Sequence, residues 1–263
     1  MQKLKNKVAA VYGNGAVGGA IAKAFAREGA RVFLAGRTLG KLKEIADEIL
    51  SDGGQVETAK VDALDELAVQ KHMSELINKA GKVDISFNAI GLPRTGIPRA
   101  PLTELSVESF SLPIMTYTQS HFITSKMAAR QMVKQKNGVI MMHVPDPSRT
   151  SAPFLGGRSP AYAAIELLCR SLSAEYAQQG VRAVCLLTTG LLETPLVNEA
   201  FNSYARAQDV SYDQFLSSIE SRTHAKRLTT LTELTNTAIF AASDEGSAFT
   251  GTTLNLTLGM IAN

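Results

Sequence analysis

The chain has 263 residues, of which 45% are hydrophobic, and its formal net charge is +3. This length and composition suffice for one domain with a sizeable core, and we expect no second domain. The basic residues are scattered and are not interleaved with aromatic residues, which excludes a typical nucleic-acid-binding surface. A small acidic or phosphorylated ligand is compatible with this charge.

The first residues, MQKLKNKVAAVYGNGAVGGAIA, imitate a secretory signal, but four glycines interrupt the apolar segment. No run of about twenty apolar residues is available for a membrane span. The two cysteines, Cys169 and Cys185, cannot make a disulfide framework and lack metal-ligand spacing with the four histidines. We therefore expect a cytoplasmic protein without a metal site or a membrane partner.

Short apolar runs alternate along the chain with longer segments of helical periodicity. In chain order, the predicted strands are VAAVY, RVFLA, QVETAKV, VDISFN, GVIMMHV, VRAVCLL and TTLNLTL. The predicted helices between them cover residues 16–29, 38–51, 65–80, 103–135, 160–178 and 231–242. Strands joined by crossover helices form a parallel sheet with helices on both faces. The sequence therefore predicts a doubly wound, Rossmann-like α/β fold of three layers, as a single domain over residues 1–263.

One long polar insertion, residues 193–225, follows the sixth predicted strand. Ligands of doubly wound folds bind at the carboxyl ends of the strands, so this insertion is expected to be a substrate lid. It contains Phe201, Tyr204, Tyr212 and Phe215, which predict a partly aromatic pocket wall.

The first strand passes into its helix through GNGAVGG, in which Gly13, Gly15 and Gly18 have the spacing G-x-G-x-x-G. Gly13 allows a sharp turn, Gly15 allows the backbone to approach a pyrophosphate, and Gly18 allows close packing of helix on strand. Because the motif follows a strand and opens a helix, it predicts a dinucleotide site that includes Asn14 and Val17.

The second strand ends in LAGRT, so Gly36 and Arg37 stand where folds that prefer NAD commonly carry an acidic residue. The missing carboxylate removes repulsion against a 2′-phosphate, and a guanidinium can hold that phosphate with two hydrogen bonds. We expect NADP(H) to be preferred, with NAD(H) possible. The alternative is that Arg37 is an exposed arginine in a solvated loop.

The order of elements, with DALDE at 62–66, FNAIG at 87–91 and the helix containing SPAYAAIELL, resembles the short-chain dehydrogenase/reductases over nearly the whole chain. By this resemblance, Asp62 would address the adenine amino group, next to Ala63. Asn88 and Ala89 would lie along the adenosine ribose and support the central strand. The resemblance further places near the cofactor Gly91 and, in the segment TGLLET at 189–194 beside the nicotinamide, Gly190, Leu192 and Thr194.

The chain departs from that family in its catalytic residues. Tyr162 occupies the position of the family's tyrosine, but Glu166 replaces the lysine one helical turn later. By register, Tyr117 falls on the asparagine position and Pro145 on the serine position. Ser148 is the nearest hydroxyl and could serve if its loop folds back; otherwise it is a turn-capping serine.

A lysine one turn away lowers a tyrosine pKa towards the working pH, and a glutamate at the same position does the reverse. With Glu166, we therefore expect Tyr162 to stay protonated. A protonated phenol can donate to a carbonyl oxygen but cannot act as the base in alcohol oxidation, which favours a reductase. Glu166→Lys is expected to lower the tyrosine pKa.

Three other side chains are candidates for a replacement acid: His143, His121 and Arg158. A lone histidine on an apolar strand, such as His143, is usually a satisfied core residue. Arg158 lies in a Gly-Gly-Arg-Ser-Pro segment, where the default interpretation is a solvated loop charge.

These observations favour an NADP-dependent carbonyl reductase that acts on a small-molecule carbonyl or alcohol. The alternatives are a non-redox lyase or isomerase of the same fold and a nucleotide-sensing or structural protein. The helices over 112–135 and 160–178 have apolar residues on more of their circumference than one core contact requires, which predicts a homodimer or homotetramer. The residues that illustrate this are Phe122, Met127, Leu167, Leu168 and Leu172.

Overall fold

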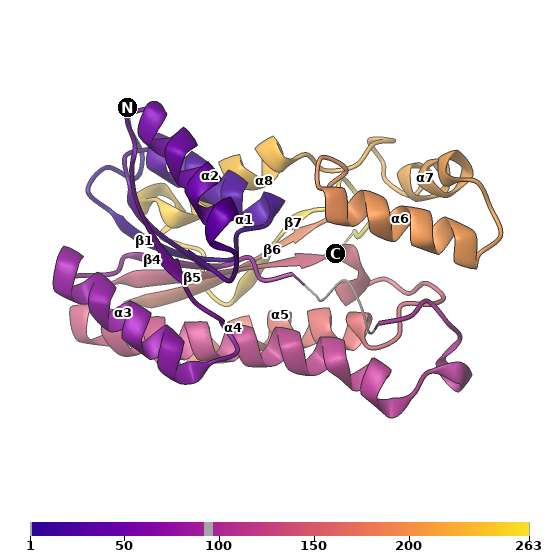
Figure 1. Cartoon of the computed structure of the whole chain (residues 1–263), viewed down its shortest axis with the longest axis horizontal. Coiled ribbons are helices and arrows are strands. Elements are labelled where there is room, and N and C mark those ends of the chain that lie inside the picture. Colours follow the sequence, from indigo (N-terminus) through magenta and orange to yellow (C-terminus); the bar gives the residue numbers. More distant parts are fainter. Residues whose placement is uncertain (1, 92–96, 263) are drawn as a thin grey trace.

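The computed structural model describes residues 2–91 and 97–262. Its centre is a seven-stranded sheet in the order β3-β2-β1-β4-β5-β6-β7, and every pair of neighbouring strands is parallel. The predicted doubly wound, single-domain α/β fold is confirmed (Figure 1). The strands are β1 Val8–Tyr12, β2 Arg31–Gly36, β3 Gln55–Lys60, β4 Ile85–Asn88, β5 Gly138–Pro145, β6 Val181–Thr188 and β7 Thr252–Leu256.

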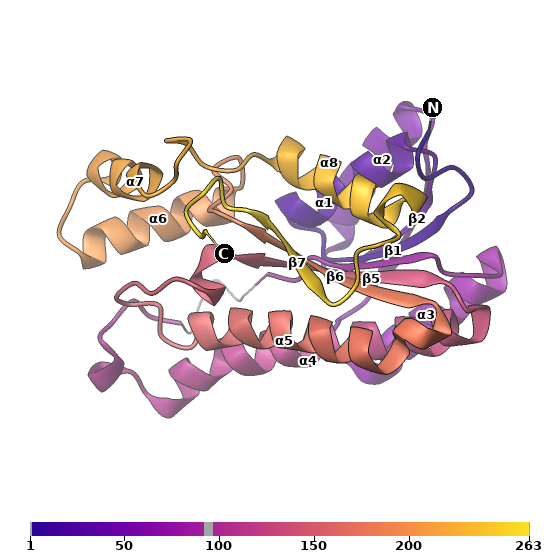
Figure 2. The ribbon, with the colours of Figure 1, turned by 180° about the vertical axis from the view of Figure 1, so that it is seen from behind.

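Helices cover both faces of the sheet (Figures 1 and 2). One layer consists of α1 Ala16–Arg27, α2 Leu39–Ser51 and α8 Leu231–Ala242, and the other of α3 Glu66–Ala80, α4 Val107–Gln135 and α5 Arg158–Tyr176. Each layer packs its own apolar cluster against the sheet. Because both faces are covered, β1 is buried along its whole length, as an apolar run such as VAAVY predicts.

The predicted helix over 103–135 begins later than expected, at Val107. The Ser106 side chain accepts a hydrogen bond from the Ser109 backbone amide and so caps the helix, and a short 3₁₀ turn, Leu102–Glu104, precedes it. In contrast, α5 begins two residues earlier than expected, at Arg158. Across residues 2–91 and 97–262, none of the helices combines the length and the apolar character that crossing a membrane requires.

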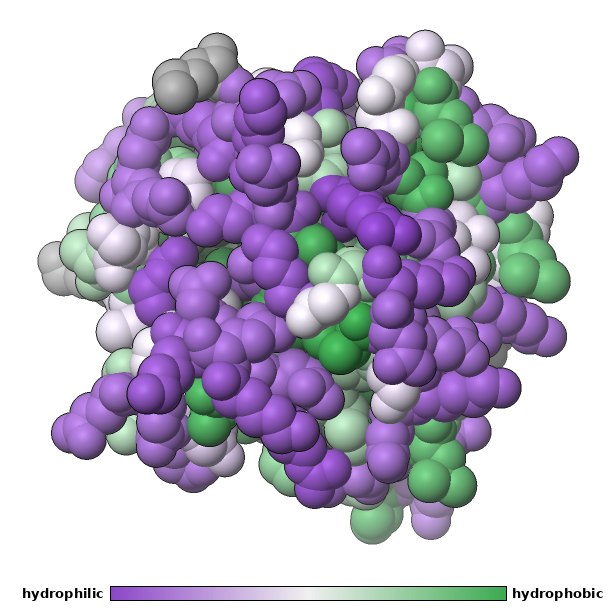
Figure 3. All heavy atoms as spheres, turned by 90° about the vertical axis from the view of Figure 1, so that its left-hand side faces the viewer, coloured by the Kyte–Doolittle hydropathy of each residue, from purple (hydrophilic) through white to green (hydrophobic). Residues whose placement is uncertain are grey.

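The insertion over 193–225 is not an irregular loop, because it contains two helices, α6 Pro195–Ala207 and α7 Tyr212–Ser221. Both lie beyond the carboxyl ends of the strands (Figure 1). The opposite end of the molecule, at the amino ends of the strands, is mostly hydrophilic (Figure 3). This arrangement places the strand ends that carry ligands in such folds beneath the predicted lid.

Most of the lid's aromatic side chains pack against one another. The Phe215 ring lies 5.3 Å from the Phe201 ring and 6.0 Å from the Tyr204 ring, between centroids. The Tyr212 hydroxyl donates to the Asn198 side chain at 2.7 Å. These rings form a core within the lid, and the partly aromatic pocket wall stays a prediction, with Tyr204 also lying against Arg99.

Candidate active site

The glycine turn after β1 has the geometry that its spacing predicts. Gly13 has a φ of 115°, and a Cβ on it would lie 2.6 Å from the Ala89 carbonyl oxygen. A Cβ on Gly18 would collide with the Gly13 backbone. A Cβ on Gly15 would meet nothing within 4 Å. The turn is thus closed on the protein side and open at Gly15, next to the amino terminus of α1.

Asn14 connects this turn to the end of β2. Its amide donates to the Thr38 carbonyl at 2.9 Å, and a Cβ on Gly36 would lie 2.8 Å from the Asn14 side chain. Residue 36 therefore has no room for the acidic side chain of NAD-preferring folds. Arg37, the next residue, is exposed at this edge.

The residues expected near the adenosine lie along the same edge. Asp62 is exposed after β3, and its carboxylate accepts from the Leu64 backbone at 3.1 Å. Ala63 beside it is buried. The Asn88 side chain is buried and donates to Thr124 at 2.9 Å, tying β4 to α4. Asn88 is therefore fully used in supporting the sheet.

The open Gly15 and the uncapped amino terminus of α1 fit the pyrophosphate of a dinucleotide, because backbone amides there have no side-chain partner. Val17 is half-buried in the first turn of the same helix. The Arg37 guanidinium would lie towards the adenosine end of such a ligand. The chemistry of this edge is therefore that of a nucleotide site.

The residues of the segment after β6, which were expected beside the nicotinamide, contact the lid helix α6. A Cβ on Gly190 would collide with Phe201 of α6, and the Leu192 carbonyl accepts from Asn198 of α6 at 2.6 Å. The Thr194 hydroxyl donates to the Leu191 carbonyl at 2.8 Å and caps α6. Gly91 faces the same helix, since a Cβ there would lie 3.6 Å from Leu196.

Tyr162 and Tyr117 form a pair under the lid. Their ring centroids are 5.1 Å apart in an edge-to-face arrangement. Burial raises the pKa of the Tyr162 phenol well above its ordinary value, Tyr117 and Tyr204 raise it further, and Arg158 and Arg99 lower it. Burial likewise raises the pKa of Tyr117. Both phenols are therefore protonated at neutral pH.

The Glu166 carboxylate forms an ion pair that the sequence did not reveal. The Arg149 side chain donates twice to one carboxylate oxygen, at 2.8 Å from Nε and 2.6 Å from Nη2, and Thr253 donates to it at 2.9 Å. Burial opposes ionisation of Glu166, but hydrogen bonds from Arg149, Ser148 and Thr253 outweigh it and lower the pKa of Glu166. Glu166 was expected to keep Tyr162 protonated by raising its pKa. This cause is wrong, because burial and the neighbouring phenols raise the tyrosine pKa.

Ser148 lies in the short 3₁₀ turn Asp146–Ser148 that follows β5. The loop folds back as far as Glu166, whose pKa the Ser148 hydroxyl helps to lower. The hydroxyl oxygen is buried without a partner of good hydrogen-bond geometry. Pro145 ends β5 opposite Thr188. Ser148 is thus placed beside the Glu166 ion pair.

Of the two candidate histidines, His121 is buried and His143 is partly buried, and both are neutral. His121 Nδ1 lies 2.9 Å from the Tyr117 carbonyl, and His143 Nε2 lies 2.9 Å from the Thr188 hydroxyl. Burial lowers the pKa of each to about 4. Neither imidazole carries an acidic proton at neutral pH.

Arg158 is 7% exposed, so its interpretation as a solvated loop charge is wrong. As the first residue of α5, it donates from Nη2 to the Ile97 carbonyl at 2.7 Å and from Nη1 to the Leu155 carbonyl at 3.3 Å. Arg99, two residues after Ile97, lies over the Tyr204 ring, with its Cζ 3.9 Å from the centroid. Arg99 lies in an irregular segment, where no periodic pattern indicates a functional residue.

Asp146 is a second group that sequence reasoning missed. Burial raises the pKa of its carboxyl to about 6, and a hydrogen bond from Thr150 and the charge of Arg222 oppose that shift. It directly follows Pro145, at the end of β5. Asp146 lies in DPS, a turn-forming sequence, which predicts an exposed residue rather than a partly buried one.

Cys169 and Cys185 are free and buried. Within the part of the chain that the structure describes, no three histidine, cysteine or carboxylate side chains are grouped so that they could hold a metal ion.

Comparisons with known proteins agree with this geometry. A family profile described as enoyl-(acyl carrier protein) reductase matches residues 12–260. Oxidoreductase UcpA of Salmonella typhimurium is 30% identical over 262 residues, covering 96% of this chain and 93% of the relative. Uncharacterized oxidoreductase YxbG of Bacillus subtilis is 29% identical over 264 residues, covering 100% of this chain and 93% of the relative. A solved structure from Burkholderia xenovorans, assigned to the short-chain dehydrogenase/reductases, is 26% identical with a TM-score of 0.88, covering 99% of this chain and 98% of the other.

Proposed function

Because the chain belongs to the short-chain dehydrogenase/reductases, which are NAD(P)-dependent oxidoreductases, we propose that it reduces a carbonyl compound with NADPH and that Tyr162 donates the proton. The dinucleotide, when bound, supplies hydride to the carbonyl carbon. The observation that carries the proposal is the half-buried, protonated Tyr162 on α5, in a chain whose glycine turn fits a dinucleotide.

The protonation state of Tyr162 supports the direction of reaction. A carbonyl oxygen that becomes an alkoxide needs one proton, and a neutral phenol can give it. Alcohol oxidation needs the tyrosinate instead, and burial disfavours this charged form. Arg158 and Arg99 oppose the shift but leave the tyrosine pKa raised. Reduction is therefore the favoured direction at neutral pH.

The preference for NADPH rests on the end of β2. Asn14 occupies the space that a side chain at residue 36 would need, so no carboxylate can stand there to repel a 2′-phosphate. Arg37 is exposed and lies one residue further, where its planar guanidinium can pair with that phosphate. NADH, which lacks the phosphate, gains nothing from Arg37.

A second candidate function follows from the Arg149–Glu166 ion pair. The pair stands where the family has a lysine, so two compensated charges replace the ammonium group that would lower the tyrosine pKa from this position. Arg158 and Arg99 lower that pKa but leave it raised. This favours a chain that binds the nucleotide without redox turnover, as a sensing or structural protein or as a non-redox lyase or isomerase. The two functions differ in whether NADPH is consumed.

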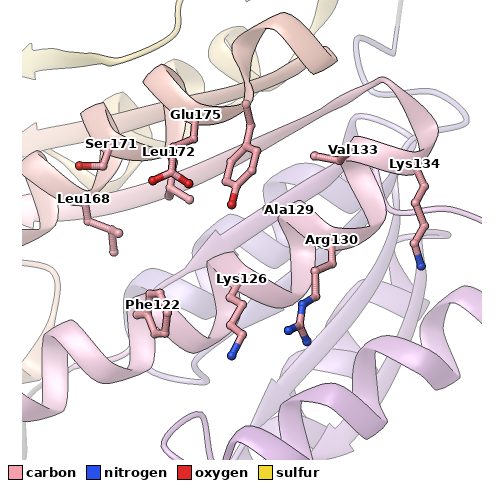
Figure 4. Close-up of a pocket in the computed structure, with 11 residues that line it drawn as sticks. Phe122, Lys126, Ala129, Arg130, Val133, Lys134, Leu168, Ser171, Leu172 and Glu175 are labelled. Carbon is pink, nitrogen blue, oxygen red and sulfur yellow. The ribbon is translucent and has the colours of Figure 1, made fainter.

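We propose that the chain assembles as a homodimer or homotetramer through α4 and α5. Phe122 and Leu167 are 53% and 61% exposed, whereas Met127 and Leu172 of the same helices face the core. Side chains of the two helices line a groove on this face, including Phe122, Ala129 and Leu168 (Figure 4). A second copy of this face would cover the exposed apolar side chains.

Dinucleotide titration followed by a substrate screen tests the proposed function. Fluorescence titration with NADPH measures binding, and loss of NADPH absorbance in the presence of aldehydes, ketones and an enoyl thioester measures turnover. The proposal expects binding and consumption of NADPH with a carbonyl compound. Binding with no consumption in any arm would support the nucleotide-sensing alternative, and product formed without a change in NADPH would support the non-redox one.

A further inference from the structure

In the described part of the chain, Arg99 Nη1, His121 Nε2 and Ser159 Oγ are buried without a hydrogen-bond partner, and Ser148 Oγ has only its contact with Glu166. Their segments all belong to the edge of the molecule at which the strands end. Buried polar groups are normally paired, so several unpaired ones at a single edge indicate a place where a ligand supplies the partner. Arg99 is the strongest of the four, because an unpaired cation is the most costly to bury.

Three elements bring the Arg99 guanidinium next to Tyr162. Arg158 lies one helical turn before Tyr162 on α5, so both side chains project from the same face of the helix. The hydrogen bond from Arg158 to the Ile97 carbonyl, at 2.7 Å, holds the segment that contains Arg99 against this turn. Tyr204 of α6 then stacks on the other side of Arg99, with 3.9 Å between Cζ and the ring centroid.

The two arginines form no ion pair with a carboxylate in the described residues. The ionisable groups of opposite sign that act on them are the phenols of Tyr162 and Tyr204. Asp146 acts on Tyr204 and is itself balanced by the charge of Arg222. Burial lowers the pKa of Arg99 to about 10; Tyr204 and Tyr162 oppose the shift, and Arg158 adds to it. Both guanidiniums are therefore charged at neutral pH and repel one another. A bound anion would offset both the repulsion and the loss of hydration.

We propose that the substrate carries an anionic oxygen group, a carboxylate or a phosphate, that binds to Arg99 beside Tyr162. Arg158 has its Nη atoms on backbone carbonyls, so it acts as a positioning residue and adds positive charge, while Arg99 Nη1 is the unpaired donor. A planar guanidinium matches a carboxylate or a phosphate with paired hydrogen bonds. The inference rests on the proposed function, since it defines the substrate class of the same site.

Matched substrates test this inference by steady-state kinetics at saturating NADPH. The pairs are 2-oxopentanoate with pentan-2-one, for a carboxylate, and dihydroxyacetone phosphate with dihydroxyacetone, for a phosphate. We expect the anionic member of at least one pair to have the lower KM. Arg99→Gln is expected to raise that KM about 10- to 100-fold, as the loss of a charged hydrogen bond does, and to raise the KM of the neutral member far less. The pair that responds identifies the anion.

Arg206→Gln is the matched control. Arg206 is an exposed arginine on α6, the lid helix that carries Tyr204, and its loss changes the net charge as much as the loss of Arg99 does. Arg99→Lys keeps the charge but loses the paired donors of the guanidinium, so its KM for the anionic substrate should lie between those of the wild-type and Arg99→Gln proteins. This variant also tests the inference if Arg99→Gln folds poorly. Equal KM values for charged and neutral members, or equal effects of Arg99→Gln and Arg206→Gln, would overturn the inference.

Calorimetry separates this inference from the proposed function. The NADPH-saturated protein is titrated with 2-hydroxypentanoate and with glycerol 3-phosphate, which cannot react because neither alcohol can accept a hydride. Binding of one anion that weakens about 10- to 100-fold in Arg99→Gln supports the anion site even if no carbonyl compound is reduced. If neither anion binds in the millimolar range while a neutral carbonyl compound is reduced, the proposed function stands and the anion site is rejected.

Discussion

The Arg149 guanidinium lies 2.6 Å from the Glu166 carboxylate, one helical turn after Tyr162. Both side chains are largely buried, and Thr253 donates a further hydrogen bond to the same carboxylate oxygen. The pair compensates a negative charge that would otherwise disfavour the tyrosinate and repel an anionic ligand. Arg149, which the loop after β5 brings next to α5, therefore balances the charge of Glu166.

Glu166→Lys alone is expected to destabilise the protein. The new ammonium would face the buried Arg149 guanidinium, and breaking a buried pair in this way costs about 3–5 kcal/mol. Adding Arg149→Glu restores an opposite pair and should recover part of the loss. Denaturant unfolding of the single variants, the double variant and the wild type measures the coupling; a single Glu166→Lys as stable as wild type would contradict the ion pair's role.

The same carboxylate predicts a dependence of stability on pH. Hydrogen bonds from Arg149, Ser148 and Thr253 outweigh burial and lower the pKa of Glu166 in the folded chain. A depressed pKa gives stability that is present above the ordinary glutamate pKa and is lost as the pH falls through the folded value. Glu166→Gln should flatten this acid limb of the unfolding free energy, relative to Glu44→Gln at an exposed position on α2. Parallel acid limbs for both variants and wild type would show that Glu166 does not contribute.

Asp146→Asn is expected to stabilise the protein at neutral pH. The pKa of Asp146 is raised to about 6, chiefly by burial, so the folded state binds more protons than the unfolded state between the two pKa values. Stability therefore falls as the pH rises through this interval, by up to about 3 kcal/mol, and stays reduced above it. Thermal unfolding at acid and neutral pH measures the difference, which should shrink in the variant. An unchanged difference would mean that Asp146 has an ordinary pKa.

Arg37→Ala is expected to weaken NADPH binding about 10-fold or more while leaving NADH binding nearly unchanged, because only NADPH carries the 2′-phosphate that the guanidinium can hold. Fluorescence titration of both dinucleotides gives the two dissociation constants. Lys43→Ala, an exposed cation on α2, is the control for general loss of positive charge. Equal affinities for NADPH and NADH in the unmodified protein would contradict the proposed preference for NADPH.

The assembly prediction concerns the α4–α5 face. Sedimentation at micromolar concentration should detect a dimer or tetramer, and Phe122→Glu with Leu167→Glu should produce monomers, because two charges cannot be buried in an apolar contact. Leu50→Glu on α2 is the control, since Leu50 is 55% exposed and α2 lies in the helix layer on the other face of the sheet. A monomeric wild-type protein would contradict the prediction.

The fold was predictable because strands and helices leave periodic patterns and the glycine turn leaves a spacing. The helix over 231–242 has the predicted bounds, and Gly13 and Gly18 are closed against backbone as predicted. The position of Tyr162 on its helix also followed from the sequence.

The partners of the charged residues were not predictable. Arg149 and Glu166 are 17 residues apart and meet only because the loop after β5 turns back, which no periodicity encodes. Arg158 was misread because the glycines before it suggested a loop, although it begins α5 and bonds to Ile97. The lid's aromatic residues were correctly located in an insertion, but their packing against each other depends on two helices that the polar composition concealed.

Single-turnover consumption of NADPH by the wild-type and Tyr162→Phe proteins, with a carbonyl compound identified in the screen, tests the central claim most directly. Both proteins are first titrated with NADPH, so that a loss of turnover is not a loss of binding. The account predicts equal NADPH affinity and a fall in the rate of about 100-fold or more in Tyr162→Phe, since a positioned proton donor contributes that much. An unchanged rate in Tyr162→Phe would show that the tyrosine is not the proton donor.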